Sequence, residues 1–275
     1  MKILSISTQK PHSTGSGVYL TELVKSFDRA GHEQAVVAGV YKEDTFEFPE
    51  AVSTYPVYYS HGDSVGDLPY EVLGMSDVMP YPSTLYNSLT EDMADMLYRA
   101  FGKAIGKAIK GLNPDVILCH HLFLLTSMLP SIVKEFAADS FHGKIYGISH
   151  GSDLRQFQNC PFRHEAVIEG MKQLDGIFAL HEEQKSQISE LYDISDDKIK
   201  VIGTGYNSQI FKMVEDTDKP LSDDPYKIIY AGKLSTAKGI FPLVEVLTEL
   251  DKDSEIPAFE LLLAGGCQEE GIARL

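Results

Sequence analysis

The sequence predicts an α/β fold in which a doubly wound parallel sheet is followed by a second, incomplete unit of the same kind. Short apolar runs suited to buried strands recur along the chain, and segments of helical periodicity alternate with them. The 275 residues, of which 43% are hydrophobic, suffice for two α/β domains or one large one. We expect a first domain over residues 1–213, a linker over 214–225 and a partial second domain over 226–275.

The first element is a strand over residues 3–7, followed by a loop over 9–17 that contains Gly15, Ser16 and Gly17. A helix over residues 18–30 and a strand over 34–40 complete a β-loop-α-β opening typical of a doubly wound, Rossmann-like domain. The loop lacks the full dinucleotide fingerprint, so we do not predict a nicotinamide site.

Residues 41–87 are irregular and rich in proline, glycine, aspartate and tyrosine. Their tyrosines are candidates for a platform on which a sugar acceptor stacks: Tyr55, Tyr58, Tyr59, Tyr70, Tyr81 and Tyr86. Alternatively these rings simply pack beneath a long loop. A loop of this length inside a compact domain can also hide a strand or a lid.

A capping box over residues 88–91 predicts a long helix that ends at Gly111. Three further elements lead to the next candidate residues. They are a buried strand over 116–119 that runs into His120 and His121, a helix over 122–137 that Pro130 bends or splits, and a strand over 144–149 that runs into His150 and Asp153. The remaining elements of this domain are a helix over 162–173, a strand over 176–180, a helix over 182–192 and a strand over 200–202.

The second domain opens with an apolar strand over residues 228–231, which we expect to be buried on both faces. Gly232 and Lys233 follow, then a short loop leads to Lys238 at the start of a helix that reaches about residue 250. A helix N-terminus and two lysines beyond a parallel strand favour a bound anion. The alternative is a solvent-exposed turn with two ordinary surface lysines. A last strand over 259–264 precedes Gly265 and Gly266.

The segment KIIYAGKLSTAKGI, residues 227–240, resembles the opening of the donor domain in retaining glycosyltransferase family 4, a group with the GT-B fold. The resemblance implies that Lys233, in place of the usual arginine, and Lys238 hold the diphosphate of a nucleotide-sugar donor. It also implies donor contacts at several glycine-rich positions, namely Gly15, Ser16, Gly17, Gly232, Gly265 and Gly266. His150 and Asp153 resemble the family's His-Gly-x-Asp motif at the reaction centre, and His120 and His121 are acceptor-side candidates.

The resemblance implies a transfer of a sugar, with retention, from a nucleoside diphosphate to a glycan or lipid-linked acceptor, without cofactor or metal. The leaving diphosphate would take the acceptor's proton. The family's two-glutamate donor motif is not found, because Glu269 and Glu270 are adjacent and follow the wrong strand. We therefore expect a C-terminally truncated chain with weak or no activity. Cys119 lies across its strand from His120, and no convincing ligand spacing appears, so we predict no zinc site.

The net charge of −16 argues against a nucleic-acid partner, which would need a basic surface. Three scattered cysteines without a CxxC pattern, and no apolar stretch of about 20 residues, favour a cytoplasmic protein, with peripheral contact to the inner membrane face only through its acceptor. Two alternatives stay open. One is a nucleotide-sugar epimerase with the GT-B fold, and the other is a degenerate module that binds a glycan or a partner without catalysis.

Overall fold

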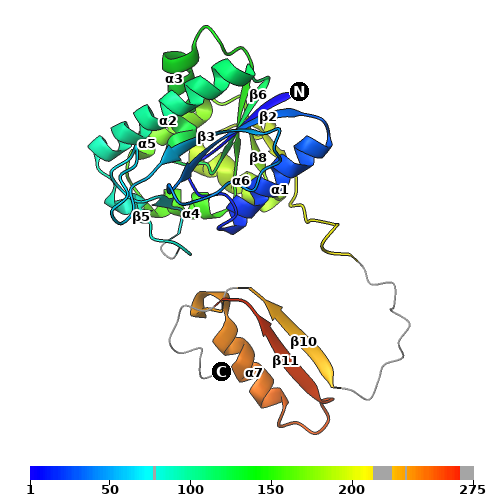
Figure 1. Cartoon of the computed structure of the whole chain (residues 1–275). Coiled ribbons are helices and arrows are strands. Elements are labelled where there is room, and N and C mark those ends of the chain that lie inside the picture. Colours follow the sequence, from blue (N-terminus) through cyan, green and yellow to red (C-terminus); the bar gives the residue numbers. More distant parts are fainter. Residues whose placement is uncertain (77–78, 213–224, 233, 267–275) are drawn as a thin grey trace. The chain divides into compact units, whose positions relative to one another are not determined.

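The computed structural model describes residues 1–76, 79–212, 225–232 and 234–266 (Figure 1). The chain divides into two compact units, Met1–Asn207 and Ser208–Leu275. The predicted linker over residues 214–225 lies almost wholly outside the described residues, as does Lys233. Each unit is considered by itself below.

The first unit is built on a seven-stranded sheet in which every neighbouring pair of strands runs parallel, in the order β3-β2-β1-β6-β7-β8-β9. The order reverses between β1 and β6, as in a doubly wound sheet. This confirms the predicted fold class. The strands are β1 (Lys2–Ser7), β2 (Glu33–Val40), β3 (Ser53–Tyr58), β6 (Val116–His120), β7 (Lys144–Ile148), β8 (Gly176–Ala179) and β9 (Ile199–Val201).

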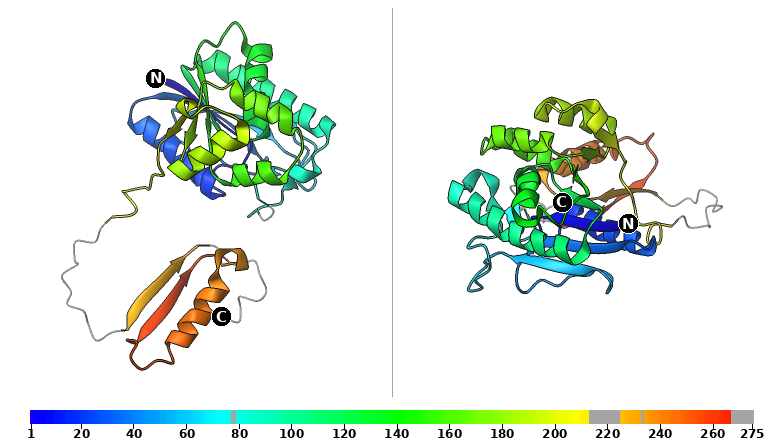
Figure 2. Two further views of the ribbon diagram at one scale, coloured as in Figure 1. Left: turned by 180° about the vertical axis from the view of Figure 1, so that it is seen from behind. Right: turned by 90° about the horizontal axis from the view of Figure 1, so that it is seen from above.

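Helices cover the two faces of this sheet unequally (Figure 2). The largest apolar cluster joins one face to α2 (Glu91–Leu112), α3 (Leu124–Ala137), α4 (Ser152–Asn159), α5 (His164–Lys172) and α6 (Glu182–Tyr192). The other face packs against α1 (Gly15–Arg29). Leu20 and Val24 of α1 pack against β2, and Leu23 and Phe27 of α1 pack near β1 and β6. Alternate side chains of each strand therefore enter different cores, which is why the central strands are apolar throughout.

The first two α-helices begin at other residues than the sequence predicts. Helix α1 starts at Gly15 rather than Val18, because the Thr14 hydroxyl accepts a hydrogen bond of 3.1 Å from the Gly17 N–H and caps the helix. Helix α2 is capped by Thr90, whose hydroxyl accepts from the Met93 N–H, so the predicted capping box at Ser88 is wrong. Ser88 instead ends the short 3₁₀ helix η1 (Tyr86–Ser88).

The irregular segment over residues 41–87 contains the edge strand β3 and the two-residue strands β4 (Leu73–Gly74) and β5 (Thr84–Leu85). Its tyrosines serve mostly as core. Tyr59 is fully buried and Tyr86 is 1% exposed, with Tyr70 and Tyr81 packed against the same cluster. Burial raises the pKa of Tyr86 well above its usual value, so its hydroxyl stays protonated at physiological pH. The packing interpretation therefore holds for these rings.

Three further differences concern the helices after β6. Helix α3 continues through Pro130 from Leu124 to Ala137 without splitting. Helix α4 stands directly after His150, where the sequence suggested only a loop, and α5 begins at His164 behind a left-handed Arg163. The short helix η2 (Asp196–Lys198) leads into β9.

The second unit consists of two parallel strands and one helix: β10 (Tyr226–Ala231), η3 (Thr236–Lys238), α7 (Ile240–Leu250) and β11 (Phe259–Ala264). Its small core holds Leu234 and Ile240 with Tyr230, Phe241 and Leu243 around them. Ile229 is 66% exposed, so the prediction that β10 is buried on both faces is wrong for this chain. Within the described part of the chain, α7 is the helix that covers this pair of strands.

Candidate active site

The carboxyl ends of β6 and β7 bring three histidines together, and we call His120, His121 and His150 the histidine cluster. Because β6 and β7 pair in parallel with His120 opposite Ile148, their last residues meet at one edge of the sheet. The Nδ1 atom of His120 lies 3.0 Å from Nε2 of His150. The rings of His121 and His150 have their centroids 4.8 Å apart. The two acceptor-side candidates and the predicted catalytic histidine therefore form one group.

His121 adopts a left-handed backbone conformation with φ of 72°, which is uncommon for a residue with a side chain. Two hydrogen bonds hold it there. Its N–H donates to the Ile148 carbonyl at 2.9 Å, and its carbonyl accepts from the Thr126 hydroxyl at 2.5 Å. The turn at the end of β6 is thereby fixed, so the His121 ring has a defined direction towards α1.

The N-terminus of α1 forms a second side of the site. Ser16 Oγ lies 3.0 Å from His121 Nε2. The Tyr19 ring packs edge-on against the His150 ring, with the two ring centroids 5.2 Å apart. The predicted glycine loop is thus the first turn of a helix. A Cβ on Gly17 would lie 2.6 Å from the Lys10 carbonyl oxygen, so this glycine permits close packing against the chain's own backbone. Gly15 has open space around it.

Asp153 is buried and points its carboxylate at the backbone. One oxygen accepts the Leu122 N–H at 2.7 Å, and the other accepts the His150 N–H at 3.0 Å and the Ser149 hydroxyl at 3.2 Å. These bonds tie the turn after β6 to the turn after β7. Asp153 therefore acts as a positioning residue that places His150, whereas the sequence motif suggested a residue of the reaction centre itself.

Burial keeps the histidine cluster uncharged. It lowers the pKa of His121 to about 3, and that of His120 falls well below its usual value, chiefly by burial and further through His150 and His121. The pKa of His150 is lowered to about 3 by burial first and by His121 second, against a smaller opposing effect of Asp153. All three imidazoles are neutral near pH 7, where each ring has one donor and one acceptor nitrogen.

His150 is the member of the cluster that remains partly exposed. Its Nε2 atom faces His120, while no described residue hydrogen-bonds to its Nδ1 atom. His120 Nε2 and His121 Nδ1 are buried, and neither has a hydrogen-bond partner in the part of the chain that the structure describes. In the same residues no three His, Cys, Asp or Glu side chains gather as ligands for a metal ion. The site can therefore offer a neutral hydrogen-bonding edge through His150.

The other predicted donor-side residues that the structure describes, Gly232, Lys238, Gly265 and Gly266, lie in the second unit. The N–H of Gly232 donates to the Ala264 carbonyl at 2.9 Å, and a Cβ on Gly265 would lie only 1.7 Å from the Gly232 carbonyl oxygen. The N–H of Leu234 donates to the Gly266 carbonyl at 3.0 Å. These glycines therefore let the two turns that follow β10 and β11 touch backbone to backbone.

Lys238 is exposed at the end of η3, one residue before Gly239, which caps α7 with φ of 75°. It is the predicted donor lysine that the structure describes, since Lys233 falls outside the described residues. The N-terminus of α7, an 11-residue helix, thus has a cation beside it.

A family model described as Glycosyltransferase Family 4 matches residues 13–209, which include the whole histidine cluster and the first turn of α1. The chain belongs to glycosyltransferase family 4. No curated protein sequence matches it significantly. The predicted family is thereby confirmed, and the fold described above is that of a glycosyltransferase chain.

Solved structures share the fold of this glycosyltransferase chain. Sucrose-phosphate synthase from Thermosynechococcus elongatus superposes with a TM-score of 0.64 at 16% identity, over 98% of this chain and 63% of that one. The catalytic domain of starch synthase IV from Arabidopsis thaliana, bound to ADP and acarbose, superposes with a TM-score of 0.55 at 13% identity, over 100% of this chain and 70% of that one. UDP-GlcNAc 2-epimerase from Neisseria meningitidis, bound to UDP-GlcNAc, superposes with a TM-score of 0.51 at 13% identity, over 100% of this chain and 67% of that one. The chain thus spans less than two thirds of the sucrose-phosphate synthase chain.

The sequence did not single out Tyr19 or the bond between Ser16 and His121. A signal was present, because residues three apart on a helix share one face, and Ser16 and Tyr19 have that spacing. The sequence pattern predicts a helix start at Val18 and places Ser16 in the preceding loop, so this spacing does not stand out. The glycosyltransferase cluster therefore includes a wall from α1 that depends on the Thr14 cap.

Proposed function

We propose that the protein is a retaining glycosyltransferase that transfers a sugar from a nucleoside-diphosphate sugar to a glycan or lipid-linked acceptor. The observation that carries the proposal is the partly exposed, neutral His150 at the carboxyl edge of the sheet, beside the N-terminus of α1. Ligands of open α/β sheets bind at this edge, and helix N-termini there favour phosphate groups.

The depressed pKa of His150 decides which role it takes. A general base works best when its pKa is close to the working pH, and a group that loses its proton at about pH 3 is a weak base at pH 7. We therefore assign His150 a hydrogen bond to the donor sugar rather than removal of the acceptor's proton. In the proposed reaction the acceptor hydroxyl forms the new glycosidic bond as the sugar–phosphate bond breaks, and its proton passes to an oxygen of the leaving diphosphate.

Each unit, considered by itself, has groups that favour a phosphate. In the first unit, the N–H groups of the opening turn of α1 favour a phosphate, because the first N–H groups of a helix have no partner within it. In the second unit, Lys238 supplies a positive charge at the start of α7. Groups of either kind stabilise the negative charge that grows on a diphosphate as the sugar–phosphate bond breaks.

Acceptor contacts are assigned to the rim beside His120 and His121. Both rings are buried, so we expect their contribution to be the placement of His150 and Ser16 rather than direct contact. No helix of the described residues combines the length and apolar character needed to span a membrane. We propose a cytoplasmic enzyme that meets the inner membrane face only when its acceptor is lipid-linked.

Product analysis separates transfer from epimerisation, the chemistry named for one structural neighbour. The protein is incubated with UDP-, GDP- and ADP-sugars and a neutral oligosaccharide acceptor, and proton NMR follows the anomeric signals. We expect a slow build-up of a new glycoside with the donor's anomeric configuration. A donor sugar inverted at C2, or a glycoside of inverted anomeric configuration, would contradict the proposal. A non-catalytic module would bind glycan yet leave every donor intact.

A further inference from the structure

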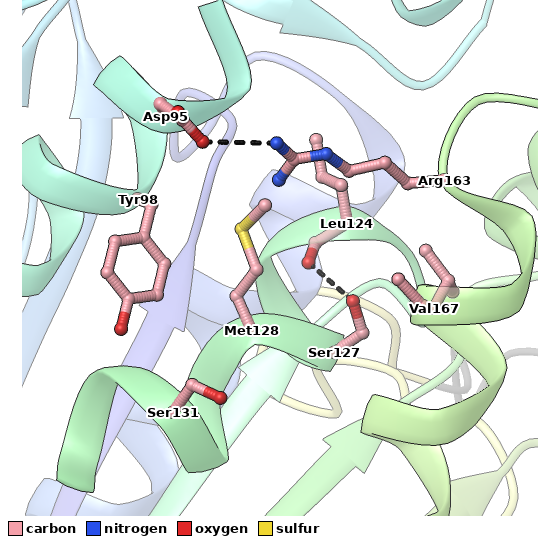
Figure 3. Close-up of a pocket in the computed structure, with 9 residues that line it drawn as sticks. Asp95, Tyr98, Leu124, Ser127, Met128, Ser131, Arg163 and Val167 are labelled. Atoms are coloured by element: carbon pink, nitrogen blue, oxygen red, sulfur yellow. Dashed lines mark hydrogen bonds and ion pairs between the residues drawn. The ribbon is translucent and has the colours of Figure 1, made fainter. Parts of the chain in front are cut away.

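A pocket of about 320 Å³ lies on the helical layer of the first unit, between α2, α3 and α5 (Figure 3). Its wall on α2 is Asp95 and Tyr98, and its floor on α3 includes the buried Leu124 and Ser127. It belongs to the face of the sheet opposite α1, so it is distinct from the wall that Ser16 and Tyr19 give to the histidine cluster. Ligand pockets start at about this size.

The pocket is formed by helices that are held rigidly. At one contact, a Cβ on Gly170 of α5 would lie 2.2 Å from the Ser127 carbonyl oxygen of α3. At another, a Cβ on Gly102 of α2 would lie 2.4 Å from the Phe136 ring. The three helices cannot shift against one another without losing these close contacts, so the hollow between them is preformed.

Arg163 closes one end of the pocket, as Figure 3 shows. From its left-handed position before α5 it reaches α2, where Nε donates to Glu91 at 2.8 Å and Nη2 donates to Glu91 and to Asp95, the latter at 3.0 Å. The Arg163 side chain is only 24% exposed, so water competes little with these charge-assisted hydrogen bonds and they hold the guanidinium in place.

Two parts of this ion pair have no hydrogen-bond partner among the described residues. They are the Nη1 group of Arg163, with two N–H donors, and the Oδ2 atom of Asp95, an acceptor. Ser131, on the rim of the same pocket, likewise has a hydroxyl to which no described residue hydrogen-bonds. Adjacent donors and acceptors on one rim match adjacent hydroxyl groups, which both donate and accept.

The rest of the lining favours an uncharged ligand with an apolar face. Tyr98 presents an aromatic wall whose hydroxyl is already engaged with Glu135 at 2.8 Å, and Met128 and Val167 are apolar. Two carboxylates, those of Glu91 and Asp95, face the Arg163 guanidinium, and the carboxylate of Glu135 lies at the Tyr98 hydroxyl. Negative charge therefore exceeds positive charge at the rim, which repels phosphates and carboxylates.

We infer that this pocket binds a neutral saccharide unit, with Tyr98 against the ring's apolar face and the Asp95–Arg163 pair on vicinal hydroxyls. The choice of a saccharide rests on the proposed function, and it adds a second contact for an acceptor glycan outside the histidine cluster. A monosaccharide has about a dozen non-hydrogen atoms, for which Kd values on the order of 1 mM are typical.

The test uses the methyl glycosides of glucose, mannose and galactose as probes, at about ten times the expected Kd of roughly 1 mM, followed by backbone-amide NMR. We expect at least one probe to shift the amide signals of residues that line the pocket. Inorganic phosphate should leave them in place, because the rim is negative. Since no nucleotide is present, failure of donor binding and failure of this inference are seen in separate experiments.

Two variants locate the binding. Ser131→Trp fills the pocket and should abolish the shifts, which corresponds to at least a tenfold loss of affinity. The control Ser186→Trp, on an exposed face of α6, should leave the shifts unchanged. Tyr98→Leu should weaken binding about tenfold while circular dichroism shows the fold intact. The inference is overturned if no probe shifts the pocket signals, if the shifts survive in Ser131→Trp, or if they vanish in His150→Ala instead.

Discussion

Removing the Asp153 carboxylate tests how the histidine cluster is positioned. In Asp153→Ala the N–H groups of Leu122 and His150 lose their acceptor, a carboxylate that is fully buried. Each stranded buried N–H costs about 1–3 kcal/mol, so we expect the free energy of unfolding to fall by about 2–6 kcal/mol.

Urea unfolding followed by far-UV circular dichroism measures this change. In Asp153→Asn the free energy of unfolding should fall by about half as much. The amide oxygen still accepts one of the two N–H groups, while the amide NH₂ group faces the other N–H group and cannot accept from it. Asp139 is an exposed aspartate in a loop, and Asp139→Ala should stay within about 0.5 kcal/mol of the parent. A loss below about 1 kcal/mol in Asp153→Ala would refute the assignment of this carboxylate as the link between the two turns.

Three further predictions concern acid stability, a close backbone contact and a helix cap. Burial lowers the pKa of His121 and His150 to about 3 in the folded chain, whereas a histidine in the unfolded chain has a pKa of about 6.5. As the pH falls, the unfolded chain therefore takes up a proton on each histidine before the folded chain does. The free energy of unfolding should decline between about pH 6.5 and pH 3, by up to about 1.4 kcal/mol per pH unit for each histidine. His121→Asn, which tolerates the left-handed backbone, should flatten that slope in urea titrations at several pH values; an unchanged slope would contradict it. Gly265→Ala should disrupt the second unit, seen as lost amide protection in that unit alone, because its Cβ would meet a carbonyl oxygen at 1.7 Å. Thr14→Ala should cost about 1 kcal/mol by urea unfolding, against no measurable change if Thr14 does not cap α1.

The sequence predicts the central strands well because both their faces are buried. Strands β1, β6 and β7 have apolar residues at successive positions, a pattern that few other structures produce. The sequence pattern leaves β3 only as a strand that the long irregular segment over residues 41–87 can hide, and Pro56 within β3 weakens the strand pattern. An edge strand tolerates proline, since one side of it needs no hydrogen-bond donor.

The cluster could be predicted only in part. Strand ends placed His120, His121 and His150 at one rim, but contacts between distant segments cannot be obtained from local pattern. Whether Asp153 turns to a substrate or to the backbone depends on where the Leu122 N–H lies, 31 residues away in sequence. Likewise Ser16 meets a histidine 105 residues away.

The pocket on α2, α3 and α5 left no signal of its own in the sequence. Arg163 precedes α5 by one residue and would ordinarily be assigned to a solvated turn. Its ion pairs span 72 residues to Glu91 and 68 to Asp95, and they exist only because α2 and α5 flank α3. Packing of helices, rather than their periodicity, creates this site.

Calorimetric titration with UDP, GDP, ADP and their sugar conjugates tests the central claim that this chain binds a nucleotide-sugar donor. We expect one nucleotide to bind, and Lys238→Ala and His150→Ala each to weaken the binding of its sugar conjugate about tenfold or more, the loss of one or two strong hydrogen bonds. Lys252→Ala and His142→Ala, which remove an exposed lysine and an exposed histidine elsewhere, should bind like the parent. A folded chain that binds none of these nucleotides, or whose affinity is the same in all four variants, would contradict the claim.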